Sequence, residues 1–159
     1  MELYFSHSLD LSEDLIITLQ EISVANDSCN GTDVREFDLS VFTSLKSLVV
    51  GDDCFANVEK CFLVELHMLQ RVKIGRYSFV KDDCDTDNGI DTNRHFRLSD
   101  CENMKELQLD GGSFLDYSVF EIDNVPHLET IRFGKGINDY YGCFHWASIE
   151  LRGDGVFCV

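Results

Sequence analysis

The fold is decided by one pattern of apolar residues that occurs twice in succession. Residues 45–55 read LKSLVVGDDCF, and residues 69–79, 24 positions further along the chain, read LQRVKIGRYSF. Both stretches carry apolar residues at their first, fourth, sixth and last positions. Less regular copies are anchored at Leu19, Met104 and Leu128. Recurrence at a nearly fixed period is the signature of a repeat protein.

A second short motif, F-x-L-x-x-F and its variants, precedes each anchor at constant offsets. Its full copies begin at Phe37, Cys61, Phe96 and Phe120, and a truncated fifth copy is Phe144-x-Trp146. The two motifs together define seven positions in each of the four full copies. Of these 28 positions, 27 are apolar, and Asn138 is the exception. A chain that is 44% apolar would reach about 12 by chance. The repeat therefore extends over most of the chain.

Alternation within each copy predicts short strands. The two apolar residues after each anchor, such as Val72 and Ile74, are separated by one residue of another kind, which is the pattern of a strand with one buried face. Stacked copies would form a parallel sheet. The preceding motif alternates as well, so we expect a second extended segment on the opposite, convex side, with room for only a helical turn between the two. Each coil of about 24 residues buries its apolar face only against its neighbours.

The spacing also carries a family resemblance. It is similar to the leucine-rich-repeat signature L-x-x-L-x-L-x-x-N/C-x-L, and the chain resembles a short, irregular protein of that family in which Phe55, Phe79 and Phe114 replace the last Leu. The resemblance covers Leu11 to Phe157. It implies an α/β-type solenoid dominated by β, with a concave parallel sheet and short extended segments on the convex side. Other residues replace the usual Asn or Cys at the ninth position, which weakens any side-chain hydrogen-bond ladder: Asp27, Asp53, Tyr77, Gly112 and Gly136.

We expect one solenoid domain over residues 1–159, with a cap-like segment at 1–18, five to six repeats at 19–157 and an acidic loop inserted at 81–95. Within the loop, three alternating aspartates precede Gly89, which resembles a calcium-binding loop. The register of that motif fails, because Gly89 stands one place late and Arg94 occupies the position that needs a bidentate Glu. We therefore expect a solvated loop without metal, and a weak calcium site is the alternative. The three aspartates are Asp83, Asp85 and Asp87.

The charge of the chain disfavours several classes of partner. Thirteen Lys and Arg residues against 29 Asp and Glu residues give a formal net charge of -16 at pH 7. Such a chain repels polyanions, so we expect no binding to nucleic acid or to anionic membranes. The first residues lack a basic segment followed by an apolar run of signal-peptide or membrane-span length. We therefore expect a cytoplasmic protein.

The cysteines and histidines show no pattern of a metal or catalytic site. The seven cysteines include no C-x-x-C pair, which disfavours both a disulfide framework and a zinc site. Cys29, Cys61 and Cys101 occupy columns otherwise filled by Phe or Leu, and we expect them in the core. The remaining cysteines lie off these columns: Cys54, Cys84, Cys143 and Cys158. The five histidines fall at different phases of the repeat, and no phosphate-binding or nucleophile motif occurs. We expect no enzyme activity and no cofactor.

The outward positions of the predicted concave sheet form a candidate recognition surface. These positions alternate with the buried pairs and are Glu21, Ser23, Ser47, Val49, Arg71, Lys73, Glu106, Gln108, Thr130, Arg132, Ser148 and Glu150. Three of the 13 basic residues, Arg71, Lys73 and Arg76, lie within six positions on one predicted strand and the turn after it. We expect a partner to contact Arg71, Lys73, Arg76, Glu106, Gln108 and Arg132. The alternative is that Glu106 and its neighbours neutralise the cations as cross-strand pairs.

Together these features favour a noncatalytic protein–protein interaction module. Repeat solenoids bind through extended surfaces, and cations on the concave face of an acidic chain fit a protein partner with an acidic surface. The alternative is a secreted or cell-surface recognition protein of the adhesin type, with calcium in the 81–95 loop. The last predicted strand, Ile149-x-Leu151, is followed by no polar capping repeat. We therefore also expect self-association through the C-terminal edge.

Overall fold

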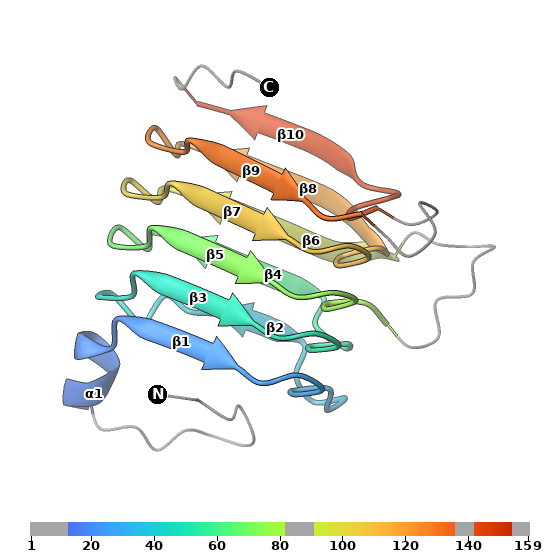
Figure 1. Ribbon diagram of the computed structural model, residues 1–159, viewed down its shortest axis with the longest axis horizontal. Coiled ribbons are helices and arrows are strands. Elements are labelled where there is room, and N and C mark those ends of the chain that lie inside the picture. Colours follow the sequence, from blue (N-terminus) through green and yellow to red (C-terminus); the bar gives the residue numbers. More distant parts are fainter. Residues whose placement is uncertain (1–12, 82–90, 136–141, 154–159) are drawn as a thin grey trace.

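Two parallel β-sheets face each other across one apolar core in the computed structural model, which describes residues 13–81, 91–135 and 142–153 (Figure 1). A short helix, α1 (Glu13–Thr18), precedes the first strand. The front sheet contains, in order, β1 (Glu21–Val24), β3 (Ser47–Val50), β5 (Arg71–Ile74), β7 (Glu106–Leu109) and β9 (Thr130–Phe133). The back sheet contains, in order, β2 (Glu36–Asp38), β4 (Lys60–Val64), β6 (Asp91–Ser99), β8 (Tyr117–Asp123) and β10 (Ser148–Arg152).

The chain visits the two sheets alternately, so each coil contributes one strand to each. Every pairing between neighbouring strands is parallel, and the register follows the repeat. Leu48 pairs with Val72, 24 residues further on, and Val72 pairs with Leu107. The result is a parallel β-solenoid with almost no helix, which confirms the predicted coil stack with two extended segments per coil. None of the described residues forms a helix long and apolar enough to cross a membrane.

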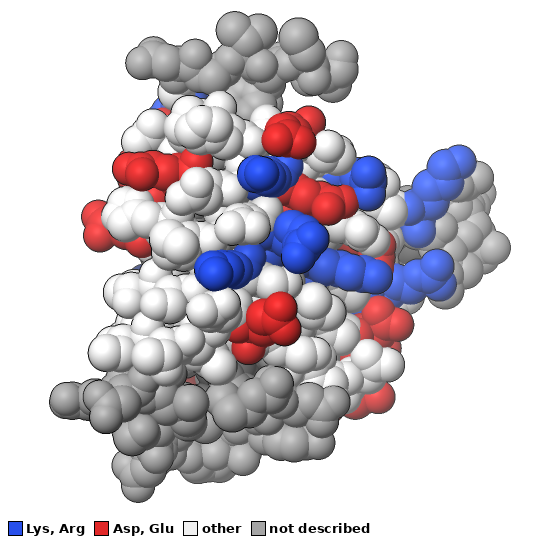
Figure 2. All heavy atoms as spheres, turned by 60° about the vertical axis from the view of Figure 1, so that its left-hand side comes forward, with Lys and Arg blue, Asp and Glu red and all other residues white. Residues whose placement is uncertain are grey.

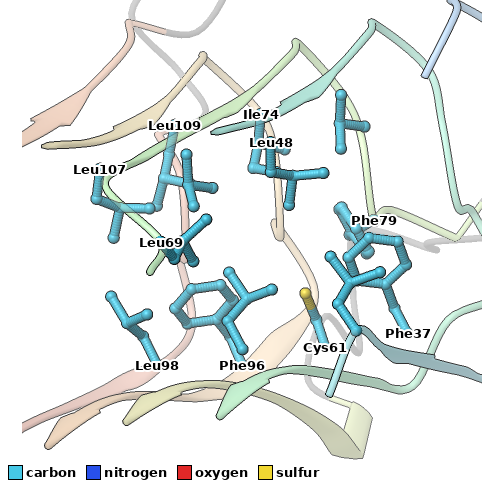
Figure 3. Packing of buried hydrophobic residues seen from close by; sticks show 14 of the residues in the cluster. Phe37, Leu48, Cys61, Leu69, Ile74, Phe79, Phe96, Leu98, Leu107 and Leu109 are labelled. Atoms are coloured by element: carbon cyan, nitrogen blue, oxygen red, sulfur yellow. The ribbon is translucent and has the colours of Figure 1, made fainter. Parts of the chain in front are cut away.

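The inward residues of the two sheets meet in a continuous core (Figure 3). Leu48 and Leu107 of the front sheet point toward Cys61 and Phe96 of the back sheet, and all four are fully buried. These are columns that the repeat predicts as apolar, so the predicted core is confirmed there. Cys101 is fully buried as well, as expected, whereas Cys29 is only partly buried at the edge of the core.

A column of stacked phenylalanines forms one corner of the coils. The ring centroids of Phe55 and Phe79 lie 5.0 Å apart, those of Phe79 and Phe114 4.6 Å, and those of Phe114 and Phe144 4.9 Å. All four residues have a positive φ, which turns the chain sharply toward the back sheet. This conformation costs a residue other than glycine about 1–2 kcal/mol. Burying a phenylalanine side chain contributes about 1.5–3 kcal/mol and offsets that cost.

A second column, immediately before the phenylalanines, carries small polar groups that hydrogen-bond to the neighbouring coil. The Sγ atom of Cys54 lies 3.0 Å from the carbonyl oxygen of Ala25, and the Oγ atom of Ser78 lies 2.7 Å from that of Gly51. The Sγ atom of Cys143 likewise lies 3.1 Å from a carbonyl oxygen of the preceding coil. Cys54 and Cys143 therefore occupy an equivalent position in each coil, although this position is not one of the apolar columns that define the repeat in the sequence. This ladder replaces the one that asparagine at the ninth position would form.

The segment expected as an acidic loop is shorter than 81–95. Strand β6 begins at Asp91, so residues 91–95 are strand rather than loop. The pairing of β6 with β8 shifts register between Asp91 and His95, which marks a β-bulge. A bulge absorbs surplus residues without breaking the ladder that follows. The predicted calcium alternative depends on residues 82–90, which lie outside the described residues.

The last coil differs from the prediction. The repeat predicts Ser148 and Glu150 on the same face as Arg71, but β10 lies in the back sheet beside β8, with Ile149 opposite Phe120. Phe144 does not begin a back-sheet motif either, since its ring stacks on Phe114 in the phenylalanine column. The reason is a second insertion between β9 and Phe144. It also explains why Asn138 was the only polar exception in the repeat.

Candidate functional site

The outward face of the front sheet carries the predicted site residues in two adjacent rows. Arg71 lies between Ser47 and Glu106 in one row. Lys73 lies between Val49 and Gln108 in the next row, which continues to Arg132. Neighbouring strands are about 4.8 Å apart, so side chains along a row lie close together. The structure therefore brings five of the six predicted site residues onto one face.

Arg71 and Lys73 extend from β5 into solvent, and Arg76 follows just beyond the end of the strand. Within the described part of the chain, none of these three side chains forms an ion pair or a side-chain hydrogen bond. The backbone N–H of Arg76 donates to Asp52 Oδ1 at 2.8 Å, which fixes the turn while leaving the guanidinium in solvent. Figure 2, seen from the side on which the front strands begin, shows Lys and Arg side chains in a band between groups of Asp and Glu.

The other three predicted residues interact with their neighbours. Arg132 Nη1 lies 2.7 Å from Glu106 Oε1, and Gln108 Nε2 donates to Asp110 Oδ1 at 3.1 Å. The alternative of cross-strand neutralisation therefore applies to Arg132 and Glu106. It does not apply to the three cations of β5 and its following turn, which we call the cation cluster (Arg71, Lys73 and Arg76). These free cations are the part of the site best placed to bind an anionic group.

Two shallow hollows flank the Arg71 side chain. One of them is mostly apolar and is lined by Ser47, Leu48, Val49, Arg71, Val72, Lys73, Glu106 and Gln108. Its floor includes Val49, an outward residue that is 38% exposed. The other is mostly polar and is lined by Gln70, Arg71, Lys105, Glu106, Glu129, Thr130 and Arg132. Arg71 thus lies between an apolar hollow and a charged one.

Lys105 is a residue of this face that the sequence reasoning missed. It lines the polar hollow and is exposed. It stands one position before β7, in a column that also contains Lys46 and Gln70 at the starts of the neighbouring strands. The signal was present in the sequence, since the residue between the anchor and the first strand residue recurs at the same period. That position precedes the alternating pair, so alternation alone does not predict that it faces outward.

Four thiols of the described residues are poorly suited to nucleophilic chemistry. Cys54, Cys61, Cys101 and Cys143 form no disulfide. Burial raises the pKa of Cys101 to about 11 and also raises the pKa values of Cys54, Cys61 and Cys143. A thiol with a raised pKa is almost entirely protonated at neutral pH, whereas the nucleophile is the thiolate. These residues therefore serve the core and the polar column.

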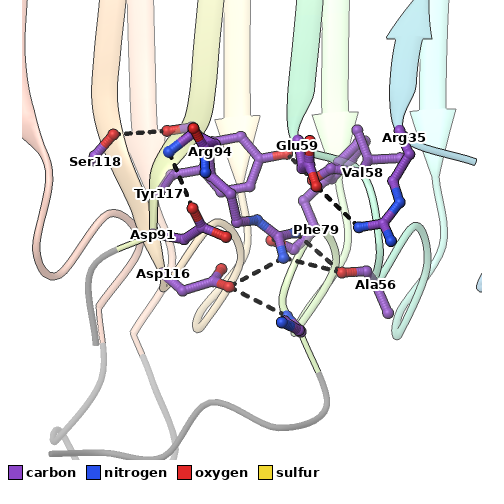
Figure 4. A network of polar contacts seen from close by, with 12 residues as sticks. Arg35, Ala56, Val58, Glu59, Phe79, Asp91, Arg94, Asp116, Tyr117 and Ser118 are labelled. Carbon is purple, nitrogen blue, oxygen red and sulfur yellow. Dashed lines mark hydrogen bonds and ion pairs between the residues drawn. The ribbon is translucent and has the colours of Figure 1, made fainter. Parts of the chain in front are cut away.

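A buried ion pair lies beside the phenylalanine column, at the start of strand β6 (Figure 4). Arg94, with 1% of its surface exposed, lies 3.0 Å from Asp116 through Nη1 and Oδ2. Its guanidinium also donates to the carbonyl oxygens of Ala56 and Phe79 at 3.0–3.1 Å. The ring of Tyr117 lies 4.9 Å below it.

The environment of this pair indicates a structural role. Burial raises the pKa of Asp116, and the charge of Arg94 partly opposes that effect. The Tyr117 hydroxyl donates to the carbonyl oxygen of Val58 at 2.8 Å. The guanidinium thus hydrogen-bonds to carbonyl groups in the turns of two different coils and ties these coils together. The sequence places Arg94 in a solvated loop, so its burial is a correction of that prediction.

The described residues contain no group of three or more His, Cys, Asp or Glu side chains placed to hold a metal ion. We also compared the whole chain with protein-family models, with curated proteins and with solved structures. None of the three comparisons gives a match.

Proposed function

We propose that the chain is a noncatalytic protein-interaction module that binds an acidic partner surface on the front sheet. The observation that carries this proposal is the cation cluster, in which Arg71, Lys73 and Arg76 remain without ion pairs in the described residues. The other five arginines of the described part all form ion pairs with carboxylates: Arg35, Arg94, Arg97, Arg132 and Arg152. In a chain of charge -16, free cations gathered on one strand are the natural contact for anionic groups.

The overall acidity of the chain does not prevent such binding. At physiological ionic strength charges are screened beyond about 8 Å, so a partner close to the cation cluster is affected mainly by local charges. Carboxylates of the partner would form charge-assisted hydrogen bonds with the Arg71 guanidinium, which can bind both oxygens at once. The acidic surroundings would in turn repel the partner from other approaches, which favours one orientation.

The apolar hollow beside Arg71 adds a second requirement. An aliphatic side chain of the partner placed over Val49 would bury apolar surface there, next to a carboxylate held by Arg71 or Lys73. We therefore propose a partner segment in which Asp or Glu alternates with an aliphatic residue. In an extended segment that alternation would place carboxylates and aliphatic side chains on opposite faces, so the segment must turn or lie edge-on across the strands.

We further propose that the coils are leucine-rich repeats of an irregular, phenylalanine-containing kind. The support is the spacing of the buried residues Leu45, Leu48, Val50 and Phe55 and its recurrence in the next coil. Binding through the face of the parallel sheet that the repeat builds is consistent with how solenoids present extended surfaces. The proposal of a cytoplasmic location rests on the sequence alone.

The binding proposal is tested with a defined probe and matched variants. The probe is a fluorescent peptide of Glu and Val residues, with a Lys and Val peptide as the negative probe. Lys73→Glu on the front sheet is compared with Lys60→Glu on the back sheet, since both lysines are exposed and the charge change is the same. The double variant Arg71→Glu/Lys73→Glu should weaken binding at least about tenfold, and added salt should weaken wild-type binding.

Fluorescence anisotropy gives the dissociation constants. Equal effects of Lys73→Glu and Lys60→Glu would show that binding depends on net charge alone and would contradict a site on the front sheet. Equal affinity for the two peptides would contradict recognition of carboxylates. Far-UV circular dichroism verifies folding, which exposed substitutions usually change by only about 0.5 kcal/mol.

A further inference from the structure

The two ends of the coil stack differ in how well their inward residues are covered. In the first coil the inward residues of β1 and β2 are at most 3% exposed. In the last coil the residues of the same columns are far more exposed: Phe133 at 49% and Ile149 at 60%. Leu151, which continues the column of Leu39 and Leu63, is 42% exposed. The core is thus closed at the N-terminal end and open at the C-terminal end.

The open end also carries the edges of both sheets. β9 is the last strand of the front sheet and β10 the last of the back sheet, and no other described strand pairs with their outer sides. Trp146, in the turn before β10, is 45% exposed and adds further apolar surface. Unpaired strand edges next to exposed apolar side chains form a surface prone to association.

The charged residues at the C-terminal end of the stack do not oppose contact with a second copy of the chain. Two chains of charge -16 repel each other over most of their surfaces. The charged residues of β9 and β10, however, are Arg132, Glu150 and Arg152, so the two strands carry no acidic excess. Arg152 Nη2 already lies 2.6 Å from Glu150 Oε2. These two strands therefore add no net negative charge to a contact between two copies.

We propose that two copies of the chain associate through their C-terminal ends as a closed dimer. The asymmetry of the stack selects this arrangement over a filament. Head-to-tail stacking needs an uncovered apolar surface at the N-terminal end, and Ile22 and Val24 of the first coil are already buried there. A second open end offers the same exposed apolar residues, Phe133, Ile149 and Leu151, as a complementary surface. Such an interface uses the same patch on both copies and closes with two-fold symmetry.

Sedimentation velocity over a concentration series tests the dimer, and Ile149→Lys is the informative variant. Because Ile149 is exposed in the single chain, its substitution should leave the fold intact while placing two opposed ammonium groups in the interface. Val41→Lys is the matched control, since Val41 is 56% exposed and lies after β2, far along the stack. Ile17→Lys in α1 tests head-to-tail stacking, because Ile17 is 51% exposed at the N-terminal end.

We expect the wild type, Val41→Lys and Ile17→Lys to form dimers with the same dissociation constant. Ile149→Lys should weaken dimerisation at least about tenfold, with an unchanged circular dichroism spectrum. A wild type that stays monomeric up to about 200 µM, where even a weak contact would be populated, overturns the proposal. So does a series of larger oligomers that Ile17→Lys abolishes, since that outcome indicates stacking in one direction. Binding of the acidic peptide is independent of these outcomes.

Discussion

Phe79 and Phe114 stack face to face, with ring centroids 4.6 Å apart and 8° between the ring planes, although 35 residues separate them in the chain. Phe55 and Phe79, which are 24 residues apart, stack in the same way at 5.0 Å. The extra residues between β5 and β7 therefore leave the core columns in register. The coils behave as one continuous stack, because each apolar column is completed by the next coil regardless of the length of chain that connects them.

The first prediction concerns the register of the front strands. Leu48 is fully buried, so Leu48→Ala should lower the free energy of unfolding by about 2–5 kcal/mol. Leu107→Ala should have a similar effect, because Leu107 is equally buried one coil beyond Val72. Ser47→Ala, at the outward neighbour of Leu48, should change stability by no more than about 0.5 kcal/mol. Urea unfolding followed by circular dichroism measures these differences, and equal losses at Leu48 and Ser47 would contradict the assignment.

The second prediction concerns the buried ion pair. Arg94→Met should destabilise the fold by about 3–5 kcal/mol, because it leaves the Asp116 carboxylate buried without its partner. The carbonyl groups of Ala56 and Phe79 also lose their donor. Asn93→Ala is the control, since Asn93 is exposed and adjacent in the chain. Urea unfolding measures both variants.

A double variant separates the pair from the rest of the network. Arg94→Met/Asp116→Leu removes both charges, and replacing a buried pair by apolar residues is often close to neutral. The double variant should therefore be more stable than Arg94→Met alone. The single variant Asp116→Leu completes the comparison. If the stability lost in the double variant equals the sum of the losses in Arg94→Met and Asp116→Leu, the two residues are not energetically coupled and the interpretation is wrong.

The third prediction concerns the buried thiols. The pKa of Cys101 is raised to about 11 by burial, so near pH 8 only about a thousandth of this group is thiolate. The pKa of Cys61 is raised as well, by complete burial. Both thiols should therefore fail to react with Ellman's reagent in the folded chain and react at once in urea. The reaction of the folded chain should speed up as pH rises, because the thiolate fraction grows.

A variant assigns the protected groups. Cys101→Ala should leave the number of fast-reacting thiols unchanged in the folded chain and lower the total in urea by one. A loss of one fast-reacting thiol would show that Cys101 is accessible, in conflict with its burial. The same comparison with Cys61→Ala tests the back-sheet column.

Local alternation and the repeat determined much of this protein from the sequence alone. Leu48 and Val72 are buried and Arg71 and Lys73 are exposed because a strand with one apolar face has a period of two residues. The 24-residue recurrence then places such strands side by side. Burial of the apolar columns therefore follows from the order of residues within one coil.

Only the tertiary structure decided the features that depend on how separate coils meet. Arg94 is buried among Asp116 and the turn carbonyl groups of Ala56 and Phe79, which are distant in sequence, so no local pattern predicts its burial. The register places Glu106 beside Arg71 and Arg132 beside Gln108, yet Arg132 reaches diagonally to Glu106 at 2.7 Å and leaves the cation cluster without that carboxylate. Strand β10 joins the back sheet because a second insertion shifts the last coil, and the uniform period of the repeat predicts no such shift.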